Sequence, residues 1–540
     1  MDDTRQALTR RAVITTLGLF PIVGPAFAAK KATRSAKAAP EPTRPTLAYP
    51  RLVDLVPGET FDLVAEPATH AFQKDKPVPA IGYGGTYMGP ALRVKRGTTP
   101  RVRLVNRLDR PTNVHWHGAL IEGRFDGGTH PGVAPGGTWE ATLALDQPAA
   151  TLWYHAHVHG STTQDVHDGL CGLLIVDDPA ATAALGLPST WGVDDLPLVL
   201  QDRDFDPTGR PVRPPLVETL EHGFRGRAMI VNGQHDAVAR VPSRLVRLRL
   251  LNASGARVFR LAFEDRRPFR LIACDAGLLP APVELDLLVL APGERAEILV
   301  DFAEGAAALV TSPDLHEHRD GHDAVIMPDV IEGQTRILAF DVVPDERPRA
   351  VMPKALVVLP PLPVSTVGLT RRRFELRLTP IADPAPPPKV KPKATPHAGH
   401  GARDHAAPDP AGMTRGSGTG THDAPEPQPT VSLLTINGRT FAMDRIDERV
   451  PLGATEVWEI VSPEMAHPFH VHGAHFRVLG EDGGMPKAWN GGLKDTVLVT
   501  DSAELLVTFT RRAGADAPFV YHCHLLEHED GGMMGAFTVE

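Results

Sequence analysis

The sequence predicts an all-β protein. Short runs rich in valine, leucine and isoleucine recur along the chain, for example at 101–108, 171–178 and 295–302, and Gly, Pro, Asp and Asn residues separate them. This pattern is typical of β-sandwiches and barrels, and no long window shows a convincing helical period. Since 540 residues exceed what a single hydrophobic core supports, we expect two to four domains.

The N-terminus has the features of an export signal. Two arginines at 10–11 precede an apolar stretch at 12–27, and residues 26–28 form a small-x-small cleavage site. We therefore expect 1–28 to be a signal peptide that directs the chain through the twin-arginine translocase to the periplasm. The alternatives are an uncleaved anchor and a chance arginine pair. No segment is long and apolar enough for a membrane span, so we expect a soluble mature chain.

The rest of the chain divides into three strand-rich regions joined by linkers. Residues 384–429, inside the third region, are rich in proline and glycine and nearly devoid of large apolar side chains, which predicts a disordered insertion. Three domains in one chain can bring its two ends together to form a site, so we expect a monomer. The expected divisions are a linker at 29–45, domains at 46–182, 183–345 and 368–540, and a proline-rich linker at 346–367.

Charge and cysteine content exclude several classes of protein. The formal net charge is −9, so no basic surface indicates a nucleic-acid partner. Three cysteines are too few for a disulfide framework. Cys171 and Cys274 lie in apolar runs, where small buried side chains are the simplest interpretation.

Four His-x-His pairs are the strongest functional signal in the chain. Because a β-strand turns alternate side chains to one face, each pair would present two imidazoles together. Neutral imidazole is the commonest protein ligand of transition metals, so four pairs suggest one shared metal cluster. The pairs are His115 and His117, His155 and His157, His470 and His472, and His522 and His524.

Cys523 lies inside the last pair and would face the opposite side of its strand. His528 and Met533-Met534 follow it, and His467 precedes the third pair. Two histidines, one thiolate and a weak axial methionine make a blue-copper electron-transfer site, whereas structural zinc gains nothing from methionine. A copper at Cys523 would therefore lie a short covalent path from the histidine cluster.

With these residues in view, the chain closely resembles the multicopper oxidases. The family motifs are HWHG (115–118), HAHVHG (155–160), HPFHVHG (467–473) and HCHLLEHEDGGMM (522–534). The resemblance implies three cupredoxin-like Greek-key domains and four copper ions. It also implies one-electron oxidation of a substrate coupled to reduction of O2 to water.

The resemblance assigns the copper ligands residue by residue. Cys523 would carry electrons from the type 1 copper to the cluster, and Met534 is the fallback axial ligand. The type 1 copper would be held by His467, Cys523, His528 and Met533, the type 2 copper by His115 and His470, and the type 3 pair by His117, His155, His157, His472, His522 and His524.

Two acidic residues match positions where the family keeps carboxylates beside the cluster. Asp126 lies in RFDGG, and Glu529 directly follows a type 1 ligand. A carboxylate there can relay protons for dioxygen reduction. The simpler interpretation is a turn aspartate and a strand-end glutamate.

Among these oxidases the chain is most similar to bacterial copper efflux oxidases of the CueO type, which also oxidise Cu(I). Their substrate site is rich in methionine, but here the segment 378–386 lacks methionine, and Met443 follows Ala442 where an acidic residue is expected. The insertion is either a flexible loop or a low-affinity copper-collecting segment. The possible accessory copper ligands are His397, His400, His405, Met413, His422 and Met443.

The resemblance implies a role in periplasmic copper tolerance, with Cu(I), phenols or both as the reductant. A general laccase for phenols and aromatic amines is the alternative within the family. Outside it, the chain could store copper without turnover. It could also be a scaffold, like a cell-division relative that has lost its copper sites.

Overall fold

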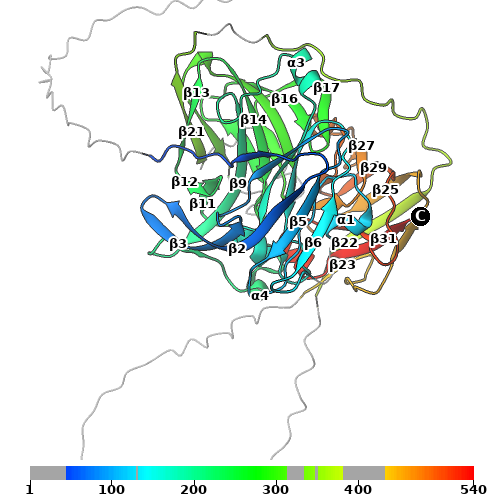
Figure 1. The fold of residues 1–540 in the computed structure, drawn as a ribbon. Helices are drawn as coiled ribbons and strands as arrows, with labels where there is room; N and C mark the ends of the chain where they lie inside the picture. Colours follow the sequence, from blue (N-terminus) through cyan, green and yellow to red (C-terminus); the bar gives the residue numbers. More distant parts are fainter. Residues whose placement is uncertain (1–43, 129–131, 313–333, 347–350, 381–431) are drawn as a thin grey trace, which may run out of the picture. The chain divides into compact units, whose positions relative to one another are not determined.

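The computed structural model describes residues 44–128, 132–312, 334–346, 351–380 and 432–540, which are built almost entirely of strands (Figure 1). Six sheets are present in these residues, two in each strand-rich region of the chain. Parallel pairings between sequence-distant strands, such as Thr60–Gln73 with Arg101–Asn106, are mixed with antiparallel hairpins. The predicted all-β fold with Greek-key sheets is confirmed.

The first region contains two four-stranded sheets that enclose a core with Trp116 and Tyr154. Three short helices, α1 (Gly123–Asp126), α2 (Thr162–Asp168) and α3 (Pro179–Ala184), lie in its loops. In spatial order the strands are β1 (Leu52–Asp54), β4 (Ala91–Lys95), β8 (Cys171–Asp177) and β7 (Ala150–His155) in one sheet, and β3 (Lys76–Tyr83), β2 (Thr60–Gln73), β5 (Arg101–Asn106) and β6 (Thr138–Thr142) in the other.

The second region contains the largest hydrophobic core, and α4 (Leu216–Thr219) and the 3-10 helix η1 (Phe302–Glu304) lie in its connections. One sheet contains β12 (Gln234–His235), β11 (Ala228–Val231), β9 (Asp195–Phe205), β14 (Leu245–Asn252), β19 (Arg295–Asp301), β16 (Phe269–Cys274) and β17 (Gly277–Leu285), with β10 (Pro211–Val212) on β9. The other contains β13 (Val238–Pro242), β21 (Thr335–Val343), β20 (Ala307–Thr311), β15 (Phe259–Phe263) and β18 (Leu288–Leu290).

The third region has two five-stranded sheets around a core with Trp458 and Cys523. Its helices are α5 (Leu526–Asp530) and the 3-10 helix η4 (Ala488–Asn490). The sheets contain β23 (Ser432–Ile436), β22 (Arg371–Pro380), β25 (Thr455–Val461), β29 (Ser502–Thr508) and β27 (His475–Glu481), and β24 (Glu448–Val450), β31 (Met534–Val539), β30 (Phe519–Cys523), β26 (His467–Val471) and β28 (Thr496–Val499).

The three regions share buried contacts. A separate core cluster joins Trp153 and Cys171 of the first region to Val199 and Leu251 of the second. Cys171 and Cys274 are both free and buried, as the apolar runs around them suggested. Among the described residues, the helices are all too short or too polar to cross a membrane.

Candidate metal centre

The eight histidines of the His-x-His pairs converge in one buried place, where each is at most 1% exposed. Strand β26 pairs with β30, which sets His470 opposite His522, and an isolated bridge joins His115 to His155. These four lie in a strand or bridge, whereas the second histidine of each pair lies just beyond it. We expected both histidines of each pair to lie in a regular strand with alternating side chains. Only the first histidine of each pair lies in a strand or bridge.

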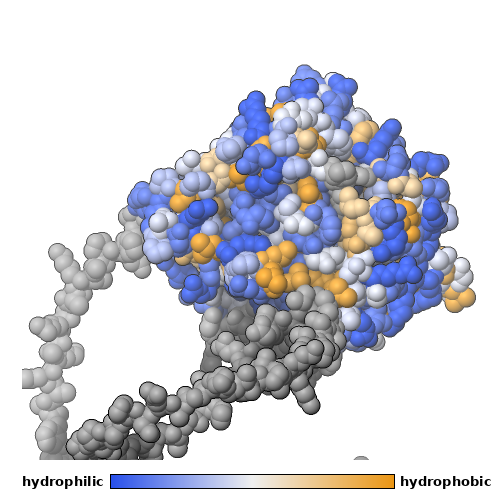
Figure 2. All heavy atoms as spheres, turned by 90° about the horizontal axis from the view of Figure 1, so that it is seen from below, coloured by the Kyte–Doolittle hydropathy of each residue, from blue (hydrophilic) through white to orange (hydrophobic). Residues whose placement is uncertain are grey.

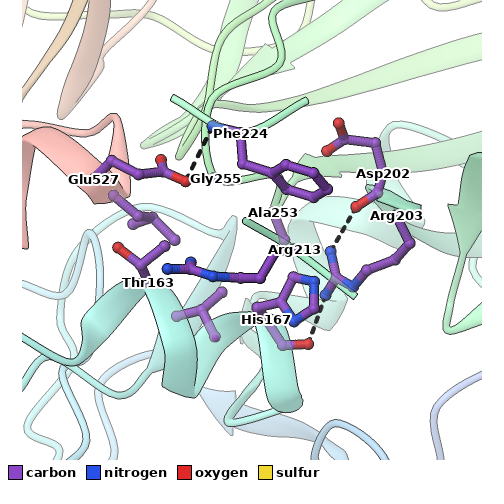
Figure 3. Close-up of a pocket in the computed structure, with 11 residues that line it drawn as sticks. Thr163, His167, Asp202, Arg203, Arg213, Phe224, Ala253, Gly255 and Glu527 are labelled. Atoms are coloured by element: carbon purple, nitrogen blue, oxygen red, sulfur yellow. Dashed lines mark hydrogen bonds between the residues drawn. The ribbon is translucent and has the colours of Figure 1, made fainter. Parts of the chain in front are cut away.

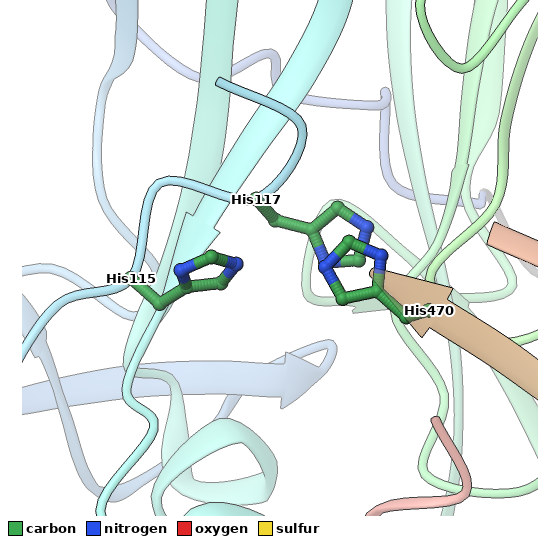
Figure 4. A group of neighbouring side chains, drawn as sticks. All are labelled: His115, His117 and His470. Atoms are coloured by element: carbon green, nitrogen blue, oxygen red, sulfur yellow. The ribbon is translucent and has the colours of Figure 1, made fainter. Parts of the chain in front are cut away.

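Ring nitrogens of these histidines form three groups, and within each group the nitrogens lie within 4.8 Å of one another. Figure 4 shows His115 and His117, from one loop, beside His470 from a distant strand. Every group mixes residues from the first and third regions, so neither region holds a complete site alone. The groups are His115, His117 and His470; His117, His155 and His524; and His157, His472 and His522.

Hydrogen bonds to backbone carbonyls fix which nitrogen of each ring has a lone pair. A carbonyl oxygen only accepts, so a ring nitrogen bonded to it must donate, and the other nitrogen of a neutral ring is free to bind a metal. Four rings donate through Nδ1 in this way and turn Nε2 toward the cluster. The pairs are His115 with Asp126 (3.1 Å), His155 with Ala156 (2.9 Å), His470 with Asp495 (2.8 Å) and His522 with Cys523 (3.0 Å).

Two such lone pairs face each other in the third group. Nδ1 of His472 lies 2.8 Å from Oδ2 of Asp126 and donates to it, so the lone pair is on Nε2, 3.2 Å from Nε2 of His522. Burial, and then the neighbouring histidines, lower the pKa of His472 and His522 well below the usual value, so both rings are neutral. Facing lone pairs repel unless a cation lies between them, so this donor set fits a metal ion.

A buried ion pair supports the cluster from the second region. Arg295 in β19 donates through Nη1 and Nη2 to both carboxylate oxygens of Asp495, at 2.7 and 2.5 Å. Asp495 also accepts from Nε2 of His117 at 3.0 Å, which turns Nδ1 of that ring toward the cluster. Burial alone would raise the pKa of Asp495, but the charge and hydrogen bonds of Arg295, then those of His117, hold it well below its usual range. Neither Arg295 nor Asp495 is marked as a site residue by a sequence motif.

Gly118 completes the HWHG motif for a steric reason. Its φ is +85°, and a Cβ there would lie 2.5 Å from Oδ2 of Asp495 and 2.6 Å from Nη2 of Arg295. Only glycine lets the backbone approach the ion pair in that conformation.

Cys523 groups with His467 and His528 on the other side of β30. Nε2 of His528 lies 3.2 Å from the carbonyl oxygen of Glu221 and must donate, so the lone pair is on Nδ1, 3.6 Å from Sγ of Cys523. Ser462, also missed in the sequence, places its hydroxyl 2.6 Å from Nδ1 of His467. One sulfur and two imidazoles suit copper. The backbone from His522 to His524 therefore links two candidate sites.

The two methionines after His528 lie in different places. Met533 is fully buried in the same core cluster as Cys523, and its carbonyl accepts from the Cys523 N–H at 3.1 Å. Met534 begins β31 and packs with Val520 and Ala536 instead. This favours Met533 over Met534 as the axial candidate. Met443, a possible accessory copper ligand that the structure describes, has a side chain that is 49% exposed.

Asp126 and Glu529 both lie against the histidines, at the ends of short helices and not in a turn or at a strand end. Oδ2 of Asp126, in α1, is 3.3 Å from Nδ1 of His115 in addition to its bond to His472. The carboxylate oxygens of Glu529, in α5, lie 3.4 Å from Nδ1 of His157 and of His522. Burial, and then the charge of Asp530, raise the pKa of Glu529 well above its usual value. The accessory candidates His397, His400, His405, Met413 and His422 lie outside the described residues.

The comparisons with known proteins agree with this geometry. Models described as multicopper oxidase match residues 65–181 and 404–540. A laccase-like multicopper oxidase, CueO, from the lignin-degrading bacterium Ochrobactrum sp. has 32% identity and a TM-score of 0.75, with 92% of this chain and all of that one covered. A laccase from Pediococcus acidilactici has 28% identity and a TM-score of 0.73, with 92% and 94% covered.

Curated relatives add a second name. The cell division protein FtsP of Xenorhabdus nematophila is 32% identical over 536 residues, which covers 99% of both chains. The chain belongs to the multicopper oxidase family. Its fold and its histidine groups support copper binding and oxidase chemistry in general, and its relatives include both named oxidases and a named cell division protein.

Proposed function

We propose that this protein is a copper-dependent oxidase that takes single electrons from Cu(I) or phenols and reduces O2 to water. The observation that carries the proposal is the completeness of the donor set: three histidine groups and a Cys523 group, buried together. When bound, a type 1 copper would accept single electrons and a three-copper cluster would deliver four of them to dioxygen.

The chain's own residues would link and supply these sites. The His522–His524 backbone joins the Cys523 group to the histidine groups, because Cys523 belongs to the first and its two neighbours belong to the others. Glu529 would pass protons from between His157 and His522, and Asp126 would hold His472 and His115 in orientation. Arg295 and Asp495 would keep the His117 ring fixed.

The proposed reductants rest on three exposed apolar side chains. Val217 in α4, Leu433 in β23 and Met443 are 59%, 44% and 49% exposed. Figure 2, which views the molecule from below Figure 1, where α4 lies, shows hydrophobic patches among hydrophilic ones. Such a surface suits small aromatic reductants as well as Cu(I).

We further propose export by the twin-arginine route, action in periplasmic copper tolerance and a monomeric state.

A second candidate is a role in cell division, because relatives identical at 32% over nearly the whole chain carry the name FtsP. A scaffold has no need of buried histidine lone pairs that face one another, whereas an oxidase does. The two candidates differ in one measurable property, which is oxygen consumption by the copper-loaded chain.

The first test is copper loading of the purified full chain, with Cys523→Ser as the matched variant. The wild type should gain an intense absorption band near the red end of the visible spectrum. It should also consume O2 when a phenol or Cu(I) is supplied as the reductant. The variant should lose the band and the activity while it keeps copper on the histidines. Copper binding without any O2 uptake by the wild type would contradict the oxidase and favour storage or a scaffold.

The second test concerns the substrate. Rates for Cu(I) and for dimethoxyphenol should be compared with and without residues 384–429. A copper-tolerance enzyme should turn over Cu(I) at a substantial rate relative to the phenol. Negligible Cu(I) oxidation in both forms would replace that role with a general laccase.

A further inference from the structure

Helix α5 carries an acidic residue, Glu527, whose contacts the proposed chemistry does not use. Glu527 is 1% exposed and precedes the type 1 ligand His528. Its Oε1 accepts a hydrogen bond from the backbone N–H of Phe224 at 3.1 Å, as the dashed line in Figure 3 shows. Phe224 belongs to the second region, 303 residues away in sequence. Glu527 therefore joins the metal-bearing helix to a distant segment.

The backbone of the second region closely approaches this carboxylate. A Cβ added at either Gly223 or Gly255 would lie 3.4 Å from Oε2 of Glu527. The N–H of Leu526 donates to the carbonyl of Gly255 at 3.0 Å, a second link at the start of α5. The Glu527 side chain is thus enclosed between α5 and the backbone at Gly223, Phe224 and Gly255.

The same segment also contacts the type 1 ligand. Glu221, three residues before Phe224, presents its carbonyl oxygen 3.2 Å from Nε2 of His528. The N–H of Gly223 donates to the carbonyl of Thr219 at 2.7 Å, which attaches the segment to α4. His528, Glu221, Phe224 and Glu527 therefore form a closed ring of backbone and hydrogen bonds.

We propose that Glu527 is a positioning residue for the type 1 site: by holding the N–H of Phe224 it keeps the carbonyl of Glu221 against Nε2–H of His528. This inference rests on the proposed copper at Cys523, His467 and His528. A hydrogen bond at the outer nitrogen of a ligating histidine fixes the ring and raises its basicity. A more basic imidazole favours Cu(II) over Cu(I). The contacts from Glu527 through Phe224 and Glu221 to His528 would therefore lower the reduction potential of the type 1 copper.

Loss of the Glu527 contact has a calculable effect. Mutation of a direct hydrogen-bond partner of a ligating histidine typically costs about 10- to 100-fold in metal affinity. Glu527 acts on His528 through the carbonyl of Glu221, so this range is the upper limit for its loss. If the loss falls on Cu(II), each factor of ten raises the potential of a one-electron couple by 59 mV. A residue that merely stabilised the fold would lower the unfolding midpoint without moving the potential.

The experiment compares the copper-loaded full chain with Glu527→Leu and Glu527→Gln, and with Glu218→Gln as the control. Glu218 is an exposed glutamate of α4, so its substitution removes a charge from the same segment without a buried contact. The readouts are the type 1 potential by redox titration, the visible and EPR spectra, and copper content. Glu527→Leu should raise the potential, Glu527→Gln should keep the wild-type potential through its amide oxygen, and Glu218→Gln should match the wild type.

Three results would overturn the proposal: an unchanged potential in Glu527→Leu, a shift in Glu527→Gln as large as that in Glu527→Leu, or an equal shift in Glu218→Gln. If Glu527→Leu fails to fold, Glu527→Asp, which draws the carboxylate back by one methylene, should shift the potential in the same direction. An unshifted Glu527→Asp would also refute it. Absence of the blue absorption in the wild type would refute the proposed function instead, which is a distinguishable failure.

Discussion

Substitution of Asp495 by alanine tests the support of the histidine cluster directly. The carboxylate accepts two hydrogen bonds from Arg295, one from His117 and one from the hydroxyl of Thr496. The side chains of Asp495 and Arg295 are both fully buried. Alanine would leave the guanidinium with Asp275 as its nearest remaining carboxylate, at 3.8 Å. Removal of one member of a buried ion pair costs about 3–5 kcal/mol, since the other charge stays desolvated.

Asp54→Ala is the matched control. Asp54 also bonds an arginine through both oxygens, Arg93 at 2.5 and 3.0 Å, but its side chain is 67% exposed. An exposed pair of this kind contributes about 0.2–1 kcal/mol because water and salt screen it. The two substitutions should therefore differ by at least ~2 kcal/mol in the free energy of unfolding.

Denaturant unfolding of the copper-free protein measures this difference, with the fluorescence of buried Trp116, Trp153 and Trp458 as the signal. The Asp495→Ala variant should also bind copper about 10- to 100-fold more weakly, because Nε2–H of His117 loses its carboxylate acceptor and is left with the hydroxyl of Thr496 at 3.1 Å. Equal unfolding midpoints for the Asp495 and Asp54 variants would refute the argument that burial makes this ion pair critical.

Three further outcomes are expected. Burial alone would raise the pKa of Glu297, but Arg247 and Arg249 lower it from 4.5 to about 2, so its contribution to stability is complete above pH 4.5 and is lost as the pH falls toward 2. Glu297→Gln should flatten the acid side of the stability profile of the copper-free chain, and an unchanged slope would contradict this. Gly118→Ala should destabilise the chain and weaken copper binding together, since its Cβ would overlap the Asp495–Arg295 pair; a variant with normal copper content would count against the steric reason. Native mass spectrometry should find one copper fewer in Cys523→Ser than in the wild type, and equal stoichiometry would reject the Cys523 group as a separate site.

The candidate ligands could be named from the sequence because metal donors are chemically distinctive and recur in short local motifs. The HWHG and HCH motifs identify themselves without knowledge of the fold. Arg295 and Asp495 could not be found in that way. Each is a single charged residue in an ordinary strand context, and their partnership spans 200 residues. Only the packing of the second region against the third brings them together.

The short helices were missed for a related reason. Helices α2 and α5 have seven and five residues, which is too few for a helical period to appear in the sequence. As a result the position of Glu529 in a helix, and the separate partners of Glu527 and Asp530, were not foreseen. Asp530 accepts from the N–H groups of Thr162 and Thr163 in α2, so neighbouring acids of one helix contact different regions.

The mixed origin of the histidine groups has a mechanical consequence. Each group takes residues from both 115–157 and 470–524, so any metal held there would be bonded to both segments and would act as a cross-link between them. Three such cross-links would close loops of more than 300 residues, which restricts an unfolded chain strongly. Removal of the metal by a chelator should therefore lower the stability of the fold as well as abolish activity, because it would remove the cross-links between segments 115–157 and 470–524.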